Sequence, residues 1–135
     1  MRPIAVLVAV AALGLTVSAG AATQSGTSLR VTYWEDGSKA EPDASWTLRC
    51  DPPRGTLPRP KTACARLAKG GWKLFTPVPP DMACTQIYGG PQKARVVGVV
   101  GGRHVWTTFT RTDGCQIERW SRLSPWLLPP GGVTR

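Results

Sequence analysis

Four cysteines constrain the fold of this 135-residue chain more than any other feature of its sequence. Cys50, Cys64, Cys84 and Cys115 lie 14, 20 and 31 residues apart, whereas zinc sites usually need close pairs such as C-x-x-C. The spacing therefore favours two disulfides over a metal centre, and we expect neither a metal nor a cofactor. The sequence alone allows three pairings, and the order of the cysteines along the chain favours Cys50–Cys64 and Cys84–Cys115.

The N-terminal segment has the parts of a secretory signal peptide: a positive charge at Arg2, a short apolar run, and small residues before the cleavage point. The apolar run is too short to span a bilayer as a stable helix. We therefore expect removal of residues 1–21, with cleavage after Ala21 or Ala22, and a secreted, extracellular domain over residues 22–135 without a membrane partner. An N-terminal core helix is the alternative. The oxidising environment outside the cell would support both disulfides.

The chain is basic, with 17 Lys and Arg against 8 Asp and Glu and a formal net charge of +9. Such a charge suits nucleic acid, a cell wall or an acidic protein as a partner. However, the basic residues form no tight run, and no aromatic pairs alternate with them as in a groove for single-stranded nucleic acid. We therefore expect a solvated basic surface and no nucleic-acid partner.

The hydrophobic pattern predicts an α+β fold, an antiparallel β-sheet of about five strands packed with two short α-helices. The expected strands include residues 28–34, 44–50, 93–100 and 104–111, and the expected helices span residues 61–69 and 116–123. On the first helix, Cys64, Leu67 and Ala68 would share a face. Residues 51–60 contain four prolines and a glycine, which excludes regular structure there. The tail, residues 124–135, stays unassigned.

Catalytic machinery is scarce in this sequence. Its one histidine, His104, falls at a predicted hairpin turn, and motifs of serine hydrolases, zinc proteases and phosphate-binding loops are absent. A small basic nuclease would need His104, Glu118 and an arginine to meet without any motif that predicts it. We therefore expect a protein that is not an enzyme, and we keep the nuclease as a third hypothesis.

Residues 82–91, MACTQIYGGP, permit two interpretations. Prolines stiffen both ends, and Cys84 would tether the segment if it were bonded to Cys115. Nothing in the sequence requires its middle to be buried. The segment is therefore either an interior strand with a bulge at Gly89-Gly90, or an extended loop that binds in the cleft of another protein, as a substrate-like protease inhibitor does.

Several motifs distributed between residue 29 and about residue 123 decide between these interpretations. They are Trp46-Thr-Leu-Arg-Cys-Asp-Pro52, Gly55-Thr-Leu-Pro-Arg-Pro60 with Ala63-Cys-Ala-Arg-Leu67, Cys84-Thr-Gln-Ile-Tyr88, Val97-Gly-Val99 and Phe109-Thr-Arg-Thr-Asp-Gly-Cys115. Four cysteines at matching spacing, with Cys-x-x-x-Tyr at the third, make a specific combination. In these motifs the chain resembles the bacterial subtilisin inhibitor-like family, small secreted inhibitors of subtilisin-type serine proteases.

The resemblance implies a compact sheet with two helices, the disulfides Cys50–Cys64 and Cys84–Cys115, an extracellular serine protease as partner, and usually a two-fold homodimer. It places the reactive bond between Gln86 and Ile87, so that Gln86 would enter the primary specificity pocket of the protease. The flanking protease contacts would come from Met82, Ala83, Cys84, Thr85, Tyr88 and Gly89.

Two features of the loop depart from the family. Its members typically carry a large apolar residue or a lysine where this chain has Gln86, and an unpaired amide in an apolar pocket costs about 0.5–3 kcal/mol. We therefore expect weaker inhibition of ordinary subtilisin, or a different target protease. Gly89-Gly90 replaces a stiffer ending and adds freedom that would allow cleavage in place of inhibition.

An alternative function uses the same scaffold without inhibition. On this hypothesis the chain is a secreted interaction protein, and Gln86 on its exposed loop serves as the glutamine donor of a cross-linking enzyme.

Overall fold

The computed structural model of this chain describes residues 14, 26–38 and 40–131. The expected signal peptide and its cleavage site lie outside the described residues, apart from Gly14. Within the part of the chain that is described, no helix has the length and apolar character needed to cross a membrane.

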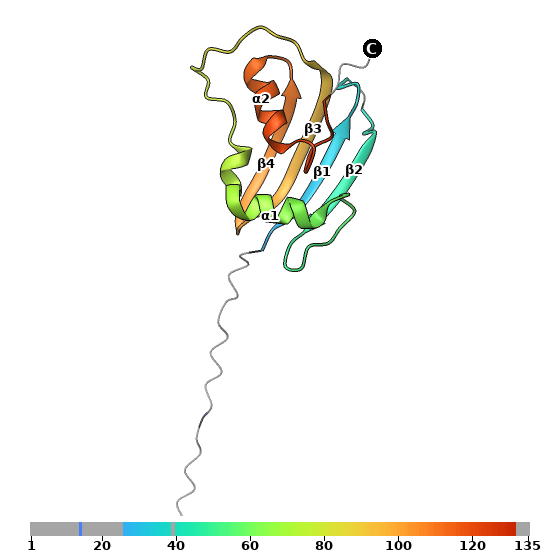
Figure 1. Ribbon diagram of the computed structural model, residues 1–135, viewed down its shortest axis with the longest axis vertical. Helices are drawn as coiled ribbons and strands as arrows, with labels where there is room; N and C mark the ends of the chain where they lie inside the picture. The colour runs from blue at the N-terminus through green and yellow to red at the C-terminus, as the bar shows by residue number, and fades with distance from the viewer. Residues whose placement is uncertain (1–13, 15–25, 39, 132–135) are drawn as a thin grey trace, which may run out of the picture.

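A four-stranded antiparallel sheet forms the centre of the described domain (Figure 1). Its strands are β1 (Ser28–Trp34), β2 (Ala44–Arg49), β3 (Gly90–Val100) and β4 (Arg103–Arg111), in the spatial order β2-β1-β3-β4. The register pairs Leu29 with Leu48 and with Gly98, so apolar residues two apart along each strand share one face. All four strands that the alternating pattern predicts are confirmed, and β3 begins three residues earlier than expected.

The described sheet has four strands, one fewer than the expected number of about five. After β2 the chain turns back along the sheet edge, where Arg54 pairs with Arg49 in an isolated antiparallel bridge. The Leu57 N–H also donates to the Thr47 carbonyl at 3.1 Å. Prolines on both sides of this segment lack N–H groups, so the pairing stops before a fifth strand forms.

Two α-helices and a short 3₁₀ helix pack on one face of the sheet (Figure 1). They are α1 (Pro60–Gly70), η1 (Gly71–Phe75) and α2 (Gly114–Leu123). Pro60 starts α1, where its missing N–H costs no helical hydrogen bond. The Asp113 carboxylate caps α2 by accepting from the Gln116 N–H at 2.9 Å. Both expected helices are confirmed, whereas η1 was not among the expected helices.

The buried face of α1 differs from the expected one. Ala63 and Leu67 are 0% and 2% exposed, Cys64 is half-buried, and Ala68 is exposed. The buried positions are therefore four residues apart, as helix geometry requires, but the stripe is shifted so that it excludes Ala68. The shift brings Ala63, rather than Ala68, beneath the sheet.

Both expected disulfides form, and they use all four cysteines. Cys50–Cys64 joins the end of β2 to α1, and Cys84–Cys115 joins the long loop before β3 to α2. Between sheet and helices lies one hydrophobic core that includes Val31, Leu48, Val96, Phe109 and Trp120, all at most 1% exposed.

The previously unassigned tail belongs to this core as far as it is described. Trp126, Leu127 and Leu128 are 5%, 2% and 1% exposed. The indole N–H of Trp120 donates to the Pro129 carbonyl at 2.9 Å, which fixes the tail against α2. The domain therefore extends beyond α2 to at least residue 129.

Candidate protease-binding loop

Residues 76–89 form a long loop that connects η1 to β3 (Figure 1). The loop runs around α2 and over one end of the sheet, and it contains no helix or strand. Three prolines, Pro77, Pro79 and Pro80, remove N–H donors from its first part. Of the segment MACTQIYGGP, only Gly90 and Pro91 belong to β3, so the interpretation as an interior strand is wrong for residues 82–89.

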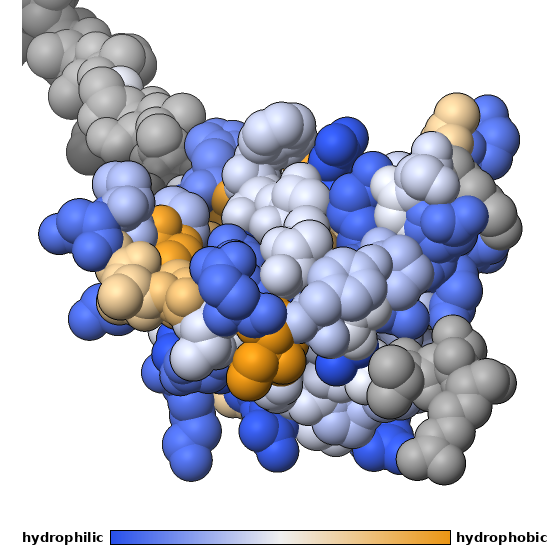
Figure 2. All heavy atoms as spheres, turned by 90° about the horizontal axis from the view of Figure 1, so that it is seen from above, coloured by the Kyte–Doolittle hydropathy of each residue, from blue (hydrophilic) through white to orange (hydrophobic). Residues whose placement is uncertain are grey.

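The loop presents its side chains to solvent at the positions that the resemblance indicates. Met82, Ile87 and Tyr88 are 54%, 61% and 63% exposed, and Ala83, Thr85 and Gln86 are exposed as well. At this end of the molecule, apolar areas are separated from one another by hydrophilic surface (Figure 2). Met82, Ile87 and Tyr88 are therefore accessible to a partner protein from one continuous loop.

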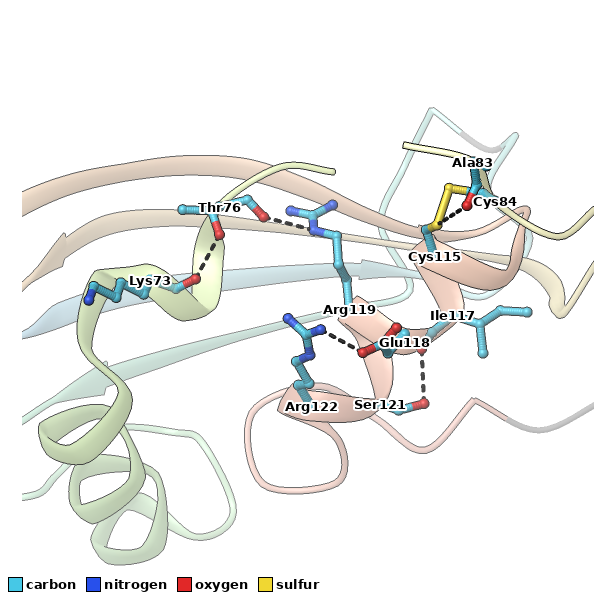
Figure 3. A network of polar contacts seen from close by, with 10 residues as sticks. All are labelled: Lys73, Thr76, Ala83, Cys84, Cys115, Ile117, Glu118, Arg119, Ser121 and Arg122. Atoms are coloured by element: carbon cyan, nitrogen blue, oxygen red, sulfur yellow. Dashed lines mark hydrogen bonds and ion pairs between the residues drawn. A yellow bond between two sulfur atoms is a disulfide. The ribbon is translucent and has the colours of Figure 1, made fainter. Parts of the chain in front are cut away.

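The centre of the loop is attached to the first turn of α2. The Cys84–Cys115 disulfide forms a covalent link (Figure 3), and the Gly114 N–H donates to the Thr85 carbonyl at 2.9 Å. A Cβ atom at Gly114 would lie 2.0 Å from the Thr85 hydroxyl oxygen. A side chain at residue 114 would displace the Thr85 hydroxyl, so Gly114 permits the close approach that holds the two residues immediately before Gln86.

The C-terminal end of the loop is attached to the end of β4. The Gly89 N–H donates to the Arg111 carbonyl at 2.7 Å, and the Arg111 guanidinium donates back to the Gly89 carbonyl. The same guanidinium nitrogen lies 3.4 Å from the Gln92 side-chain oxygen. Both backbone polar groups of Gly89 are thus bonded to one residue.

These contacts change the interpretation of Gly89-Gly90. A Cβ atom on Gly89 would lie 2.9 Å from the Ile117 side chain, and one on Gly90 would lie 2.3 Å from the Gln92 side-chain oxygen. Gly90 is also buried and has a φ of 134°, which side chains disfavour. The two glycines therefore permit close packing at the end of the loop, which argues against the freedom that we expected there.

The N-terminal end of the loop is held by Arg119 of α2, which is 7% exposed. Its Nε donates to the Thr76 carbonyl at 3.1 Å (Figure 3). Its other nitrogens donate to the Thr108 carbonyl, the Thr107 hydroxyl and the Gln116 side chain at 3.0–3.3 Å. Burial, and to a smaller extent the charge of Arg122, lowers the pKa of Arg119. This role was missed because an arginine on a short amphipathic helix looks like a surface residue in the sequence.

Gln86 and Ile87 lie between these attachments. The Gln86 side chain is exposed, and its amide nitrogen reaches the Cys84 carbonyl only at 3.5 Å. A partner protein can therefore contact the Gln86 amide without breaking a strong internal hydrogen bond. The structure thus brings together every loop residue that the sequence indicates, in one segment held at its centre and at both ends.

The other candidate chemistry is not assembled. Cys84, Cys115 and Asp113 offer ligand atoms within 4.8 Å of one another, but both sulfurs are in a disulfide and the carboxylate caps α2. The two sulfurs therefore offer no thiolate to a metal ion. His104 lies on the sheet face opposite the helices, whereas Glu118 lies on α2 and pairs with Arg122 at 2.6 Å. The residues of the nuclease hypothesis are therefore on opposite sides of the sheet.

Comparisons with known proteins identify the family of this chain. The chain matches the model of the subtilisin inhibitor-like family over residues 9–112. It is 33% identical over 121 residues to a subtilase-type protease inhibitor of Streptomyces fradiae, covering 85% of this chain and 84% of that protein. It is 39% identical over 75 residues to subtilisin inhibitor-like protein 8 of Streptomyces virginiae, covering 53% of this chain and 67% of that protein.

The fold is similar to that of Streptomyces caespitosus sermetstatin, whose crystal structure was determined in complex with Bacillus licheniformis subtilisin. The TM-score is 0.51 at 22% sequence identity, and the similarity covers 76% of this chain and 97% of sermetstatin. The family match and the identity to the S. fradiae inhibitor show that the chain belongs to the subtilisin inhibitor-like family.

Proposed function

We propose that this protein is secreted after removal of residues 1–21 and inhibits a subtilisin-type serine protease through its loop, with Gln86–Ile87 as the reactive bond. The observation that carries the proposal is the exposure of Gln86 and Ile87 between attachments at Cys84, Thr85 and Gly89. Family membership and the fold shared with sermetstatin, which was crystallised with subtilisin, support it.

A loop held in this way binds a protease with a small loss of conformational freedom. The extended residues before and after Gln86 can pair with the backbone of the cleft, as an added β-strand does. Because the loop is already ordered, fewer rotatable bonds become fixed on binding, and more of the contact energy appears as affinity.

The same attachments explain how the loop would resist net hydrolysis. The protease serine oxygen attacks the Gln86 carbonyl carbon, the Gln86–Ile87 bond breaks, and the Ile87 nitrogen takes up a proton as an amine. Thr85 remains held by Gly114, and Gly89 remains held by Arg111. The new amine therefore stays beside the acyl-enzyme ester at a high effective concentration and can reform the peptide bond before water attacks.

Gln86 determines which protease suits this loop. A neutral amide adds no charge for a trypsin-like pocket, and it needs hydrogen-bond partners inside an apolar one. We therefore propose a natural target whose primary pocket accepts a polar, uncharged side chain, and weaker inhibition of ordinary subtilisin.

The proposal is tested by incubating the purified protein with subtilisin, with trypsin and with a panel of other secreted serine proteases. We expect slowly reversible inhibition of at least one subtilisin-type enzyme, and a slow cut only at Gln86–Ile87. Rapid and complete cleavage of that bond by every protease that attacks it, without slow dissociation from any, would contradict the proposal.

We also propose a homodimer that uses the sheet face opposite the helices. On this face, Trp106 and Val97 are neighbours in the register and are 71% and 36% exposed. Arg95 lies beside them, with its guanidinium 5.3 Å from the Trp106 ring centre. Among the described residues, no helix covers this face (Figure 1). Such an apolar centre is typical of a protein–protein interface.

The dimer has a specific salt dependence. Arg30, Lys93 and Arg95 point to this face, and none of its strand positions carries a carboxylate. Two copies of the face would repel, so association should tighten as salt screens the charges. Sedimentation equilibrium from 0.05 to about 0.5 M salt checks this. A monomer at every salt concentration, or a dimer unaffected by Trp106→Glu, would contradict it.

One observation favours a second function. Gln86 is exposed on a loop, as a glutamine donor for a cross-linking enzyme must be, whereas Gln92 is only 3% exposed. Incorporation of a labelled amine by a transglutaminase, read by peptide mass spectrometry, distinguishes the functions. Labelling of Gln86 but not Gln92, together with no inhibition of any protease, would support cross-linking in place of inhibition.

A further inference from the structure

We propose that the C-terminal tail, residues 124–131, positions Arg111, and that Arg111 in turn determines how well the loop resists hydrolysis. The proposal rests on the proposed function of the loop and assigns a role to a part of the chain that the family resemblance leaves unexplained. Arg111 is a positioning residue here, because it contacts Gly89 and not the Gln86–Ile87 bond.

The tail is fixed to the domain by packing and by hydrogen bonds. Trp126, Leu127 and Leu128 are buried in the core. The Pro129 carbonyl accepts from the Trp120 indole N–H at 2.9 Å and from the Ser124 hydroxyl at 3.2 Å. The backbone that follows Pro129 therefore leaves the core from a defined point.

Two residues later, the tail lies directly against Arg111. A Cβ atom on Gly131 would lie 2.3 Å from the Arg111 Nε, 2.4 Å from its Cζ and 2.7 Å from its Cδ. The Nε is buried and donates to no group in the described chain. The terminal nitrogen on the other side of the guanidinium faces the carbonyl of Gly89 and the side-chain oxygen of Gln92.

This arrangement leaves the guanidinium little choice of direction. Gly131 lies directly against the guanidinium, so movement toward the tail is blocked and the conformation that binds Gly89 is favoured. Burial without a carboxylate partner would otherwise make the charged group seek water. The absence of a side chain at residue 131 is what allows the tail to approach without displacing the guanidinium.

The hydrogen bonds at Gly89 hold the chain on the C-terminal side of the Gln86–Ile87 bond. After cleavage, Ile87 becomes the new N-terminus, and its amine lies only two residues before Gly89 in the chain. If Arg111 holds the Gly89 carbonyl, the amine stays within reach of the acyl-enzyme. If Gly89 moves, water competes better and the loop becomes a substrate.

Gly131→Ala tests this without removing the arginine. The added methyl group meets the end of a flexible side chain, so it should turn the guanidinium away from Gly89 at little cost to the fold. Gly26→Ala is the matched control, because a Cβ atom there meets nothing within 4 Å. Arg111→Met is the second variant, and Arg122→Met on the exposed side of α2 is its control.

Two rates are measured: hydrolysis of the Gln86–Ile87 bond by the bound protease, and religation of the cleaved protein. We expect Gly131→Ala and Arg111→Met to raise net hydrolysis by about tenfold to hundredfold, the range expected for a lost charge-assisted hydrogen bond. Association rates with the protease and the thermal midpoint of Gly131→Ala should match those of the unaltered protein and of Gly26→Ala.

A second readout needs no protease. Amide hydrogen exchange at Gly89, whose N–H is bonded to the Arg111 carbonyl, should be at least about tenfold faster in Gly131→Ala than in Gly26→Ala, because loss of the guanidinium bond to the Gly89 carbonyl lets this end of the loop open more often. Unchanged exchange would overturn the role of the tail. Faster exchange with unchanged hydrolysis by an inhibited protease would overturn the role of Arg111 in resistance. Faster exchange in a protein that inhibits no protease would support the positioning of the loop and contradict the proposed function alone.

Discussion

Cys50–Cys64 and Cys84–Cys115 both join an extended segment to a helix, but their surroundings differ. Beside the first bond lie Leu48, Ala63 and Leu67, which are at most 2% exposed. Cys50 and Cys64 are themselves packed against the hydrophobic core, whereas Cys84 and Cys115 are not among the described residues that pack against it. The first disulfide therefore adds to hydrophobic packing that already joins α1 to β2, whereas the second replaces packing that the loop does not have. We expect both disulfides to contribute to stability, and only the second to govern inhibition as well.

Removal of the loop disulfide should have the largest effect on function. In a Cys84→Ser/Cys115→Ser variant, the two residues immediately before Gln86 keep only the Gly114 hydrogen bond to the rest of the domain. We therefore expect inhibition to weaken by at least about a hundredfold and hydrolysis to become fast. The free energy of unfolding should fall by up to about 3–4 kcal/mol on the chain-entropy model. Inhibition constants and urea unfolding, both measured at a temperature where the variant is folded, check these values.

Removal of the other disulfide should separate the two properties. A Cys50→Ser/Cys64→Ser variant should lose about 3 kcal/mol of unfolding free energy. Its inhibition constant should stay within about threefold of the original while the protein is folded, since a change of that size corresponds to less than 1 kcal/mol. If both double variants lost inhibition equally, the loop disulfide would have no special role in inhibition.

Substitutions of Gln86 test whether this residue enters the specificity pocket of the protease. Gln86→Leu should strengthen inhibition of subtilisin by about tenfold or more, because an apolar pocket gains buried area and loses an unpaired amide. Gln86→Lys should do the same for trypsin. Neither change should move the thermal midpoint, because residue 86 is exposed. Weaker inhibition of both enzymes by both variants would contradict the assignment of Gln86 to the specificity pocket.

Arg119 connects the two regions and should therefore affect both, but moderately. Arg119→Met removes the donors to Thr76, Thr107 and Thr108, which costs about 1–3 kcal/mol of unfolding free energy when acceptors remain buried. Inhibition should weaken less than after loss of the loop disulfide, because Thr76 is ten residues from Gln86. Arg122→Met, which removes an exposed arginine from the same helix, should change stability by no more than about 1 kcal/mol.

The smallest effect is expected on the scaffold at high pH. Burial and a 2.6 Å hydrogen bond to Glu35 raise the pKa of Tyr33 above its ordinary value of 10. The folded state therefore holds this proton more tightly than the unfolded state does. The contribution to stability is complete below pH 10 and decreases as the pH rises further. Tyr33→Phe should lack this alkaline decrease in urea unfolding, and its inhibition near neutral pH should be unchanged.

The same division between scaffold and loop determined what the sequence could predict. Strand positions such as Val31 and Leu48 follow a two-residue period that burial on one face imposes, so the strands were found within a few residues. The stripe on α1 was misplaced because several small residues, including Ala63 and Ala68, fit the helical period equally well.

The supports of the loop could not be found in this way. Arg111 and Gly89 are 22 residues apart, and Arg119 and Thr76 are 43 apart. Such contacts depend on how β4, α2 and the loop meet in space, and no local pattern encodes the direction of an arginine side chain. Gly89-Gly90 suggested flexibility in the sequence, because a glycine needed for close packing and a glycine in a mobile turn look alike until the neighbours Ile117 and Gln92 are known.

The most direct test of the central claim is the equilibrium at Gln86–Ile87 in the presence of a catalytic amount of subtilisin or of the protease that the panel identifies. The held loop predicts that intact protein and protein already cut at this bond reach the same mixture, in which the intact form is substantial and the only new N-terminus is Ile87. Complete conversion to the cut form from both directions, or a main cut outside residues 76–89, would contradict the account.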